Sequence, residues 1–285
     1  MLYLVIFILY IIAMTGVMIW QGIGIAPDRY AMILLVGSLL IKRTRQFLMD
    51  WIPFLFILIA YDFLRGFSDN LNLRVHINEL ISWEKTIFGA VPTQALQEKF
   101  FQLGSLQWYD YLATVFYFLH FALPLAFGYL LWLKSRVKFR QFILALLLMS
   151  YAAWISFLVY PAAPPWYAHD QGYLPQITKI LDQTLAAFPE KIALPTVYHQ
   201  LNPNQVAAIP SMHAGYPTLV FLFSLSFFGL RALIFLPYMV AVFLSTVYLG
   251  EHYVIDLLFG MVYALGFFFL GKLVLFKKIK YFKAT

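Results

Sequence analysis

The sequence predicts an all-α integral membrane protein with about eight transmembrane helices. Three observations predict this fold class: 62% of the 285 residues are hydrophobic, only 12% are charged, and the apolar residues gather in long runs. A soluble domain is nearer half apolar and one quarter charged, so this chain has too little polar surface to face water on every side. Because a bilayer core needs about 20 apolar helical residues, several of the runs are long enough to cross it.

We expect helices near residues 2–20, 28–41, 47–64, 111–133, 141–160, 213–228, 232–249 and 253–275. The first range lacks a basic leader, and no small-residue cleavage site follows it, so we interpret it as a span rather than a signal peptide. The second is short and follows Pro27. Two longer polar stretches remain. Residues 66–107 contain LISWEKTIFGAV, which suits a helix lying in the membrane interface, and residues 167–209 resemble an ordered cap or lid.

Basic residues fall in every second connection between the expected helices. An excess of Arg and Lys marks the cytoplasmic side, so both termini are expected in the cytoplasm and the two polar stretches on the periplasmic, extracellular or lumenal side. This placement explains the net charge of +7 and argues against a nucleic-acid partner. The clusters are Lys42, Arg43 and Arg45; Lys134, Arg136, Lys138 and Arg140; Arg231; and Lys277, Lys278, Lys280 and Lys283.

Three ionisable residues at expected helix starts are the candidate catalytic groups. His213 begins one helix, while His252 and Asp256 begin another and are four residues apart, hence on one helical face. Both helices start on the outer side, so the three side chains are expected at the same depth. Arg231 lies 18 residues from His213, roughly 27 Å along a helix, and belongs to the opposite face.

Two imidazoles and a carboxylate at paired helix N-termini suit phosphoryl transfer. The free backbone N–H groups and the positive helix ends attract an anion. Asp256 would accept a hydrogen bond from one ring nitrogen of His252 and leave the other as a nucleophile, and His213 would protonate the leaving group. A lone membrane histidine is more often a helix contact, and His120 in YFLHFALP receives that interpretation. A zinc site built from the trio is an alternative, ranked lower because no further histidine in these motifs completes a closed shell; no metal or cofactor is expected.

At these residues the chain resembles the type 2 phosphatidic acid phosphatase superfamily. The Pro-Ser-x-His motif is matched by residues 210–213, and the Ser-Arg-x5-His-x3-Asp motif is matched in position by Ser245, His252 and Asp256. The resemblance implies that His252 forms a phosphohistidine, Asp256 orients it and His213 is the general acid. It also implies a six-helix catalytic core over residues 47–285, with residues 1–46 forming two additional transmembrane helices.

The chain departs from that family where phosphate is usually clamped. No Arg-Pro dipeptide occurs, so the Lys-x6-Arg-Pro motif is absent, and Thr246 replaces the arginine of the last motif. The segments YDFLRG, YPAAPPWY and YLGEHYVID instead resemble the branch that contains inositol phosphorylceramide synthases and their prokaryotic relatives. Candidate substrate-binding residues are Arg65, Ser211, Trp166 and Tyr167; Arg65 is also interpretable as an interfacial arginine, and YPAAPPWY as a proline-stiffened helix end.

These patterns favour a membrane lipid phosphotransferase that moves a phosphoryl or phosphoalcohol group between lipids. The substrate would be a phospholipid or polyprenyl phosphate and the acceptor a lipid alcohol. With water as acceptor, the same three residues would make a lipid phosphatase acting on phosphatidate, phosphatidylglycerophosphate or a polyprenyl (pyro)phosphate. A non-enzymatic lipid transporter is the alternative from another class, but it leaves the matched depth of His213, His252 and Asp256 unexplained.

Overall fold

The computed structural model describes residues 43–71, 74–188 and 204–283, together with residues 9, 13, 16–17 and 33–36; side chains are described up to residue 66 of the first range and up to residue 273 of the last. The helices expected near residues 2–20 and 28–41 lie outside the described residues except at those isolated positions. The following account concerns the described part of the chain.

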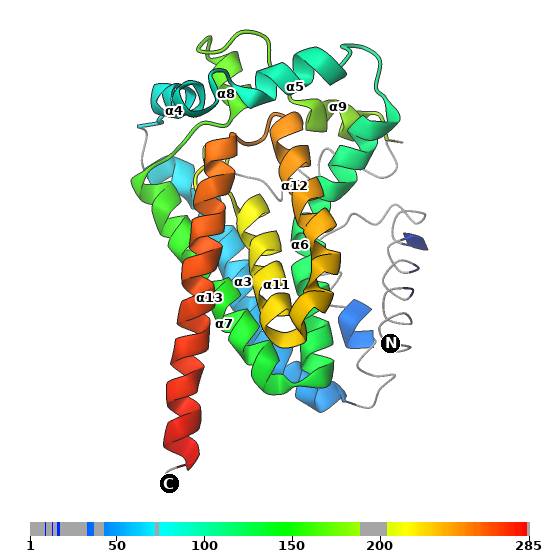
Figure 1. Ribbon diagram of the computed structural model, residues 1–285, viewed down its shortest axis with the longest axis vertical. Helices are drawn as coiled ribbons and strands as arrows, with labels where there is room; N and C mark the ends of the chain where they lie inside the picture. Colours follow the sequence, from blue (N-terminus) through cyan, green and yellow to red (C-terminus); the bar gives the residue numbers. More distant parts are fainter. Residues whose placement is uncertain are drawn as a thin grey trace.

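Six helices of the described residues run alternately up and down and form one bundle (Figure 1). Five stretches are long and apolar enough to cross a membrane, and the one at Met212–Tyr248 folds back on itself. Within it a 3-10 turn, η2 (Gly229–Phe235), joins α11 to α12. The protein is therefore a multi-pass, all-α integral membrane protein. The six helices are α3 (Thr44–Leu71), α6 (Trp108–Lys134), α7 (Arg136–Val159), α11 (Met212–Phe228), α12 (Leu236–Tyr248) and α13 (Val254–Lys283).

Four short helices lie across one end of the bundle and form an outer layer (Figure 1). They are α4 (Asn78–Phe88), α5 (Pro92–Phe100), α8 (Pro165–Asp170) and α9 (Ile180–Ala186). The helix expected within LISWEKTIFGAV is α4. It buries Leu80, Ile81 and Glu84, and it ends at Gly89, whose positive φ of 77° suits a residue without a Cβ.

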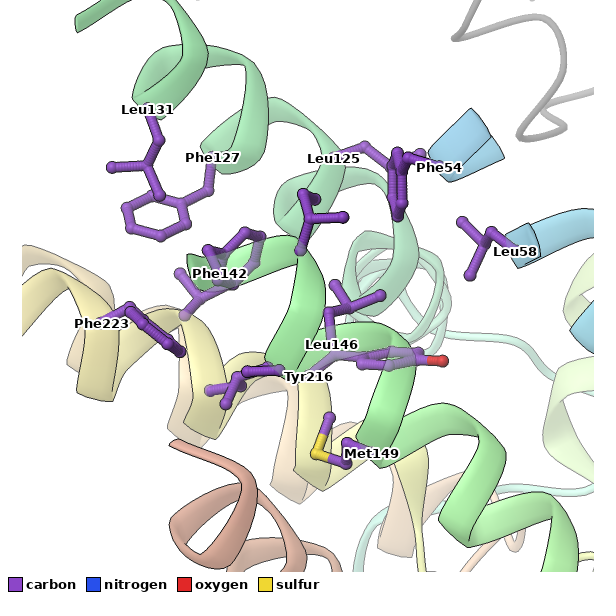
Figure 2. Close-up of a cluster of buried hydrophobic side chains, with 14 of the residues drawn as sticks. Phe54, Leu58, Leu125, Phe127, Leu131, Phe142, Leu146, Met149, Tyr216 and Phe223 are labelled. Atoms are coloured by element: carbon purple, nitrogen blue, oxygen red, sulfur yellow. The ribbon is translucent and has the colours of Figure 1, made fainter. Parts of the chain in front are cut away.

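Large aromatic and aliphatic side chains from α3, α6, α7 and α11 fill the middle of the bundle (Figure 2). Phe142 and Phe223 meet edge to face with ring centroids 5.6 Å apart, and both are fully buried. Lipid tails are as apolar as these side chains, so close packing and polar contacts, rather than exclusion of water, hold such helices together.

The end of the bundle opposite the outer layer carries an ion-pair cluster around the carboxylate of Asp50. Asp50 accepts two hydrogen bonds from Arg136, at 2.6 and 2.7 Å, and one from Arg140 at 3.2 Å. Trp132 Nε1 donates to the same carboxylate at 3.0 Å. This cluster ties α3 to α6 and α7. Arg231, in the η2 turn, lies at this end of the bundle as well (Figure 1).

Several helix boundaries differ from the sequence-based expectation, two of them near Arg65 and Arg231. The first core helix was expected to end at residue 64, but α3 continues to Leu71. A single glycine such as Gly66 costs a helix only about 1 kcal/mol, so it does not end α3, and Arg65 lies inside the helix. The helix expected from residue 232 begins at Leu236, because the preceding residues form the tighter η2 turn.

Candidate active site

The N-terminal ends of α11 and α13 lie against each other just below the outer layer. The backbone N–H of Ser211 donates to the backbone oxygen of Asp256 at 3.0 Å. Farther along α13, a Cβ on Gly260 would lie only 2.2 Å from the carbonyl oxygen of Ser211. The two helices therefore approach so closely that only glycine fits at position 260.

This close approach brings the three predicted catalytic residues into one hydrogen-bonded row. Nδ1 of His213 lies 3.0 Å from Nε2 of His252, and Nδ1 of His252 lies 3.3 Å from Oδ2 of Asp256. Asp256 is fully buried and His252 is 6% exposed. The three side chains therefore lie next to one another in the structure.

His252 reaches Asp256 from the turn before α13 rather than from the helix itself. The helix starts at Val254, two residues later than a shared helical face would require. The turn is formed at Gly250, whose φ is 85° and where a Cβ would approach the carbonyl oxygen of Thr178 to 2.9 Å. The expected geometry of two residues four apart on one helix was therefore wrong, although their contact was predicted.

The contact with Asp256 favours a proton on Nδ1 of His252. Oδ2 of Asp256 also accepts the backbone N–H of Tyr253 at 2.8 Å, so the carboxylate acts as an acceptor and Nδ1 of His252 as a donor. Nε2 of His252 is then the acceptor for Nδ1–H of His213. Burial lowers the pKa of His252 to about 3, so its imidazole is neutral at physiological pH with a lone pair on Nε2.

His120 belongs to this cluster, and the sequence interpretation missed it. Its ring centroid lies 3.8 Å from that of His213, and its Nδ1 bonds to the backbone oxygen of Tyr117 at 2.5 Å. The ring of Tyr117 is 4.2 Å from His213 on centroids. The available signal was one imidazole in the middle of an apolar helix, a costly position that usually has a reason.

Arg65 is brought to the same cluster by α3. Its guanidinium pairs with Asp62 at 3.1 Å, and its charge acts electrostatically on both His120 and His213. It therefore lies within electrostatic reach of the row, as the sequence interpretation required of a phosphate-binding cation. The phenol groups of Tyr61, Tyr117 and Tyr216 are within electrostatic reach of Arg65.

Several buried polar atoms of the row have no hydrogen-bond partner among the described residues. They are Oγ of Ser211, Nε2 of His213 and Oδ1 of Asp256. Buried polar atoms usually find a partner, and those that do not often mark a place where a ligand or water binds. Ser211 was predicted to bind substrate, and its hydroxyl is buried beside His213 and Asp256.

Trp166 and Tyr167 lie in α8, in the outer layer. The backbone N–H of Trp166 donates to the carbonyl of Gly250 at 3.2 Å, and Nζ of Lys179 lies 4.3 Å from its ring centroid. The ring of Tyr167 meets that of Trp166 at 5.6 Å. The preceding Ala162 forms backbone bridges to His76 and Ala207. YPAAPPWY therefore braces the turn before His252.

The described residues contain no group of three or more His, Asp or Glu side chains arranged to hold a metal ion. His213, His252 and Asp256 are bonded in a row, with His252 in the middle. They do not converge on one point.

Comparisons with known proteins identify the family of the chain. The sequence pattern of the PAP2 superfamily matches residues 78–270, which is more than half of the chain. The phosphoinositol dihydroceramide synthase of Bacteroides thetaiotaomicron is 27% identical over 233 residues, which cover 78% of this chain and 75% of that protein. No solved structure matches the chain.

These matches support the resemblance to the inositol phosphorylceramide synthase-like branch. An enzyme of this kind is a lipid phosphotransferase or a lipid phosphatase, so the transporter alternative is set aside. The chain belongs to the PAP2 superfamily.

Proposed function

We propose that this enzyme transfers a phosphoryl or phosphoalcohol group, such as inositol phosphate, from one membrane lipid to the hydroxyl of another through a phosphohistidine at His252. The observation that carries the proposal is the buried row in which Asp256 bonds to one ring nitrogen of His252 and the other faces His213. An imidazole held in this way is a neutral nucleophile with a proton donor beside it.

In the first step, the donor phosphate displaces the hydrogen bond between His213 and Nε2 of His252 and takes its place. Nε2 of His252 attacks phosphorus, the N–P bond forms and the P–O bond to the departing lipid breaks. The charge of the bound phosphate anion favours the imidazolium form of His213, which gives its proton to the leaving oxygen. Asp256 stabilises the positive charge that develops on the ring of His252, as an orienting carboxylate does in a hydrolase triad.

In the second step, the acceptor hydroxyl attacks phosphorus and the N–P bond breaks. His213, now neutral, removes the proton of the hydroxyl and returns to its starting state. Water would follow the same route and turn the enzyme into a phosphatase. The name of the Bacteroides relative is that of a synthase, and this similarity favours transfer to a lipid alcohol.

Arg65 and Ser211 are the proposed substitutes for the family's missing phosphate clamp. Arg65 supplies a positive charge within reach of His213, and the buried hydroxyl of Ser211 is available as a donor. A guanidinium suits a phosphate because it offers a planar pair of N–H donors. Trp166 and Tyr167 are proposed to act on the lipid path indirectly, by holding the outer layer in place. Trp166 is bonded through its backbone N–H to the turn before His252.

The active site is proposed to open on the periplasmic, extracellular or lumenal side. The N-terminal ends of α11 and α13, which His213 and His252 adjoin in the chain, lie beneath the outer layer (Figure 1). The connection between α6 and α7 and the η2 turn, which carry basic residues, lie at the opposite end of the bundle (Figure 1). An Arg and Lys excess marks the cytoplasmic side, and this supports the proposal that both termini lie in the cytoplasm.

The test uses purified enzyme with a phospholipid labelled in its headgroup, with and without a lipid alcohol such as dihydroceramide. Label in a new lipid that appears only with the acceptor, and is lost in His252→Ala, supports phosphotransfer. Free phosphate or phosphoalcohol without any acceptor would show a phosphatase instead. Full activity in His252→Ala would overturn the proposed chemistry in either form.

A further inference from the structure

Three polar side chains of the outer layer are buried without belonging to the catalytic row. They are Glu84 on α4 and Thr93 and Gln97 on α5, exposed by 0%, 0% and 5%. Polar groups buried this deeply are costly unless they bond to something. All three point toward the short stretch of chain that carries His252.

Each of these side chains bonds to a backbone group of residues 248–255. Oε1 of Glu84 accepts the N–H of Ile255 at 2.8 Å. The hydroxyl of Thr93 approaches the carbonyl of His252 at 3.5 Å, and Nε2 of Gln97 donates to the carbonyl of Tyr248 at 2.8 Å. The outer layer therefore holds the His252 turn from both of its ends and in its middle.

Glu84 has the most direct connection to the catalytic row. The first N–H groups of a helix have no partner within the helix and need a cap, and that of Ile255 in the first turn of α13 is capped by Glu84 from another helix. Asp256, the next residue, uses its own carboxylate to hold the N–H of Tyr253 and the ring of His252. Moving the first turn of α13 would therefore move both contacts.

Building on the proposed function, we infer that Glu84 is a positioning residue of the enzyme. By capping the first turn of α13 from the outer layer, it fixes the carboxylate of Asp256 against His252. The outer helix α4 is thereby part of the catalytic apparatus, in addition to covering the bundle.

The electrostatics of Glu84 provide a signature that a purely structural contact lacks. Burial, and then the charge of Asp256, raise its pKa to about 7, against the lowering effect of the N–H groups of Ile255 and Val254. The titratable groups that face it are Tyr253, in the turn before α13, and Asp256, in the first turn of α13. Burial also raises the pKa of Tyr253, so this phenol stays neutral. Glu84 therefore changes charge near neutral pH, beside Asp256.

The test compares Glu84→Gln, which keeps an oxygen acceptor for Ile255, with Glu84→Ala, which removes it. Glu79→Ala is the matched control, because Glu79 is on the same helix but is exposed and pairs with His76 instead of the His252 turn. Turnover is measured from pH 5.5 to 8.5 with the labelled phospholipid and dihydroceramide, and melting temperature in detergent reports folding. His252→Ala is assayed in parallel.

We expect Glu84→Ala to lower kcat by about 30-fold or more with little change in KM, since misplacement of a catalytic group acts on the chemical step. Glu84→Gln should keep kcat within about threefold of the wild type below pH 6.5. The wild type should also gain about two- to threefold in kcat as pH rises through 7, because a charged carboxylate is the stronger acceptor. That rise should be absent in Glu84→Gln.

A folded Glu84→Ala enzyme with wild-type kcat would overturn the inference, as would a Glu84→Gln enzyme that is as slow as Glu84→Ala. A retained inflection near pH 7 in Glu84→Gln would also overturn it. If these results occur while His252→Ala is inactive, only the role of Glu84 fails. An active His252→Ala enzyme would instead remove the proposed function.

Discussion

At the scale of single residues, the contact between His213 and His252 defines the chemistry. Replacing His213 by Ala removes the proposed proton donor, and general acid–base catalysis is worth about 10²–10⁴-fold. We expect a loss of this size in kcat with a natural lipid donor. With a nitrophenyl phosphodiester the loss should shrink to about tenfold, since that leaving group needs no proton. Equal losses on both substrates would contradict the role of His213.

Recognition of the negatively charged phosphate of the substrate should depend on Arg65. Replacing it by Ala should lower kcat/KM by about 10²-fold, because a buried charge-assisted contact to phosphate contributes about 1.5–3 kcal/mol. Arg65→Lys keeps the charge and loses the planar donor pair, so it should be intermediate. Kinetics of both variants with the labelled phospholipid check this, and an unchanged kcat/KM in Arg65→Ala would contradict it.

At the scale of elements, the close crossing of α11 and α13 positions His213 against His252. A methyl group at position 260 would meet the carbonyl of Ser211 at 2.2 Å, so Gly260→Ala should push the two helices apart. Overpacking costs typically about 1–3 kcal/mol, and the distance between His213 and His252 should grow. We expect a lower melting temperature and at least about tenfold less activity.

Gly266→Ala is the control for this prediction. It lies on the same helix, and a Cβ there would have no other atom within 4 Å. Gly266→Ala should therefore keep both the activity and the melting temperature. If Gly260→Ala also keeps the activity and melting temperature of the wild type, the close crossing is not required.

The elements were predicted from the sequence better than their tertiary contacts. Long apolar runs and basic clusters were enough to predict the six bundle helices, and helix-start signals were enough to place His213 beside His252 and Asp256. His120 and Glu84 were not predicted, because their partners are far away in the sequence. His120 contacts His213 and Glu84 bonds to Ile255, and in each pair the two residues are more than 90 positions apart. A polar residue in an apolar or amphipathic helix indicates that a partner exists, but only the packing identifies it.

At the scale of the whole molecule, the asymmetry between the two ends predicts the orientation in the membrane. The 285 residues contain no cysteine, so a single introduced cysteine is the one thiol of this chain that can be labelled. Ser105→Cys, beside the outer layer, and Arg231→Cys, in the η2 turn, replace exposed residues at opposite ends of the bundle. In intact bacterial cells a membrane-impermeant maleimide should label the first and spare the second. The reverse result would invert the proposed topology.

The central claim is that the transferred group rests on His252, and the most direct measurement is to trap it there. Enzyme is mixed with labelled donor lipid without acceptor and quenched in alkali, where phosphohistidine survives, and its peptides are analysed by mass spectrometry. We predict the label on the peptide containing His252, its disappearance when acceptor is added before the quench, and its absence in His252→Ala. Label transfer that proceeds at the wild-type rate with no modified His252 would contradict the account.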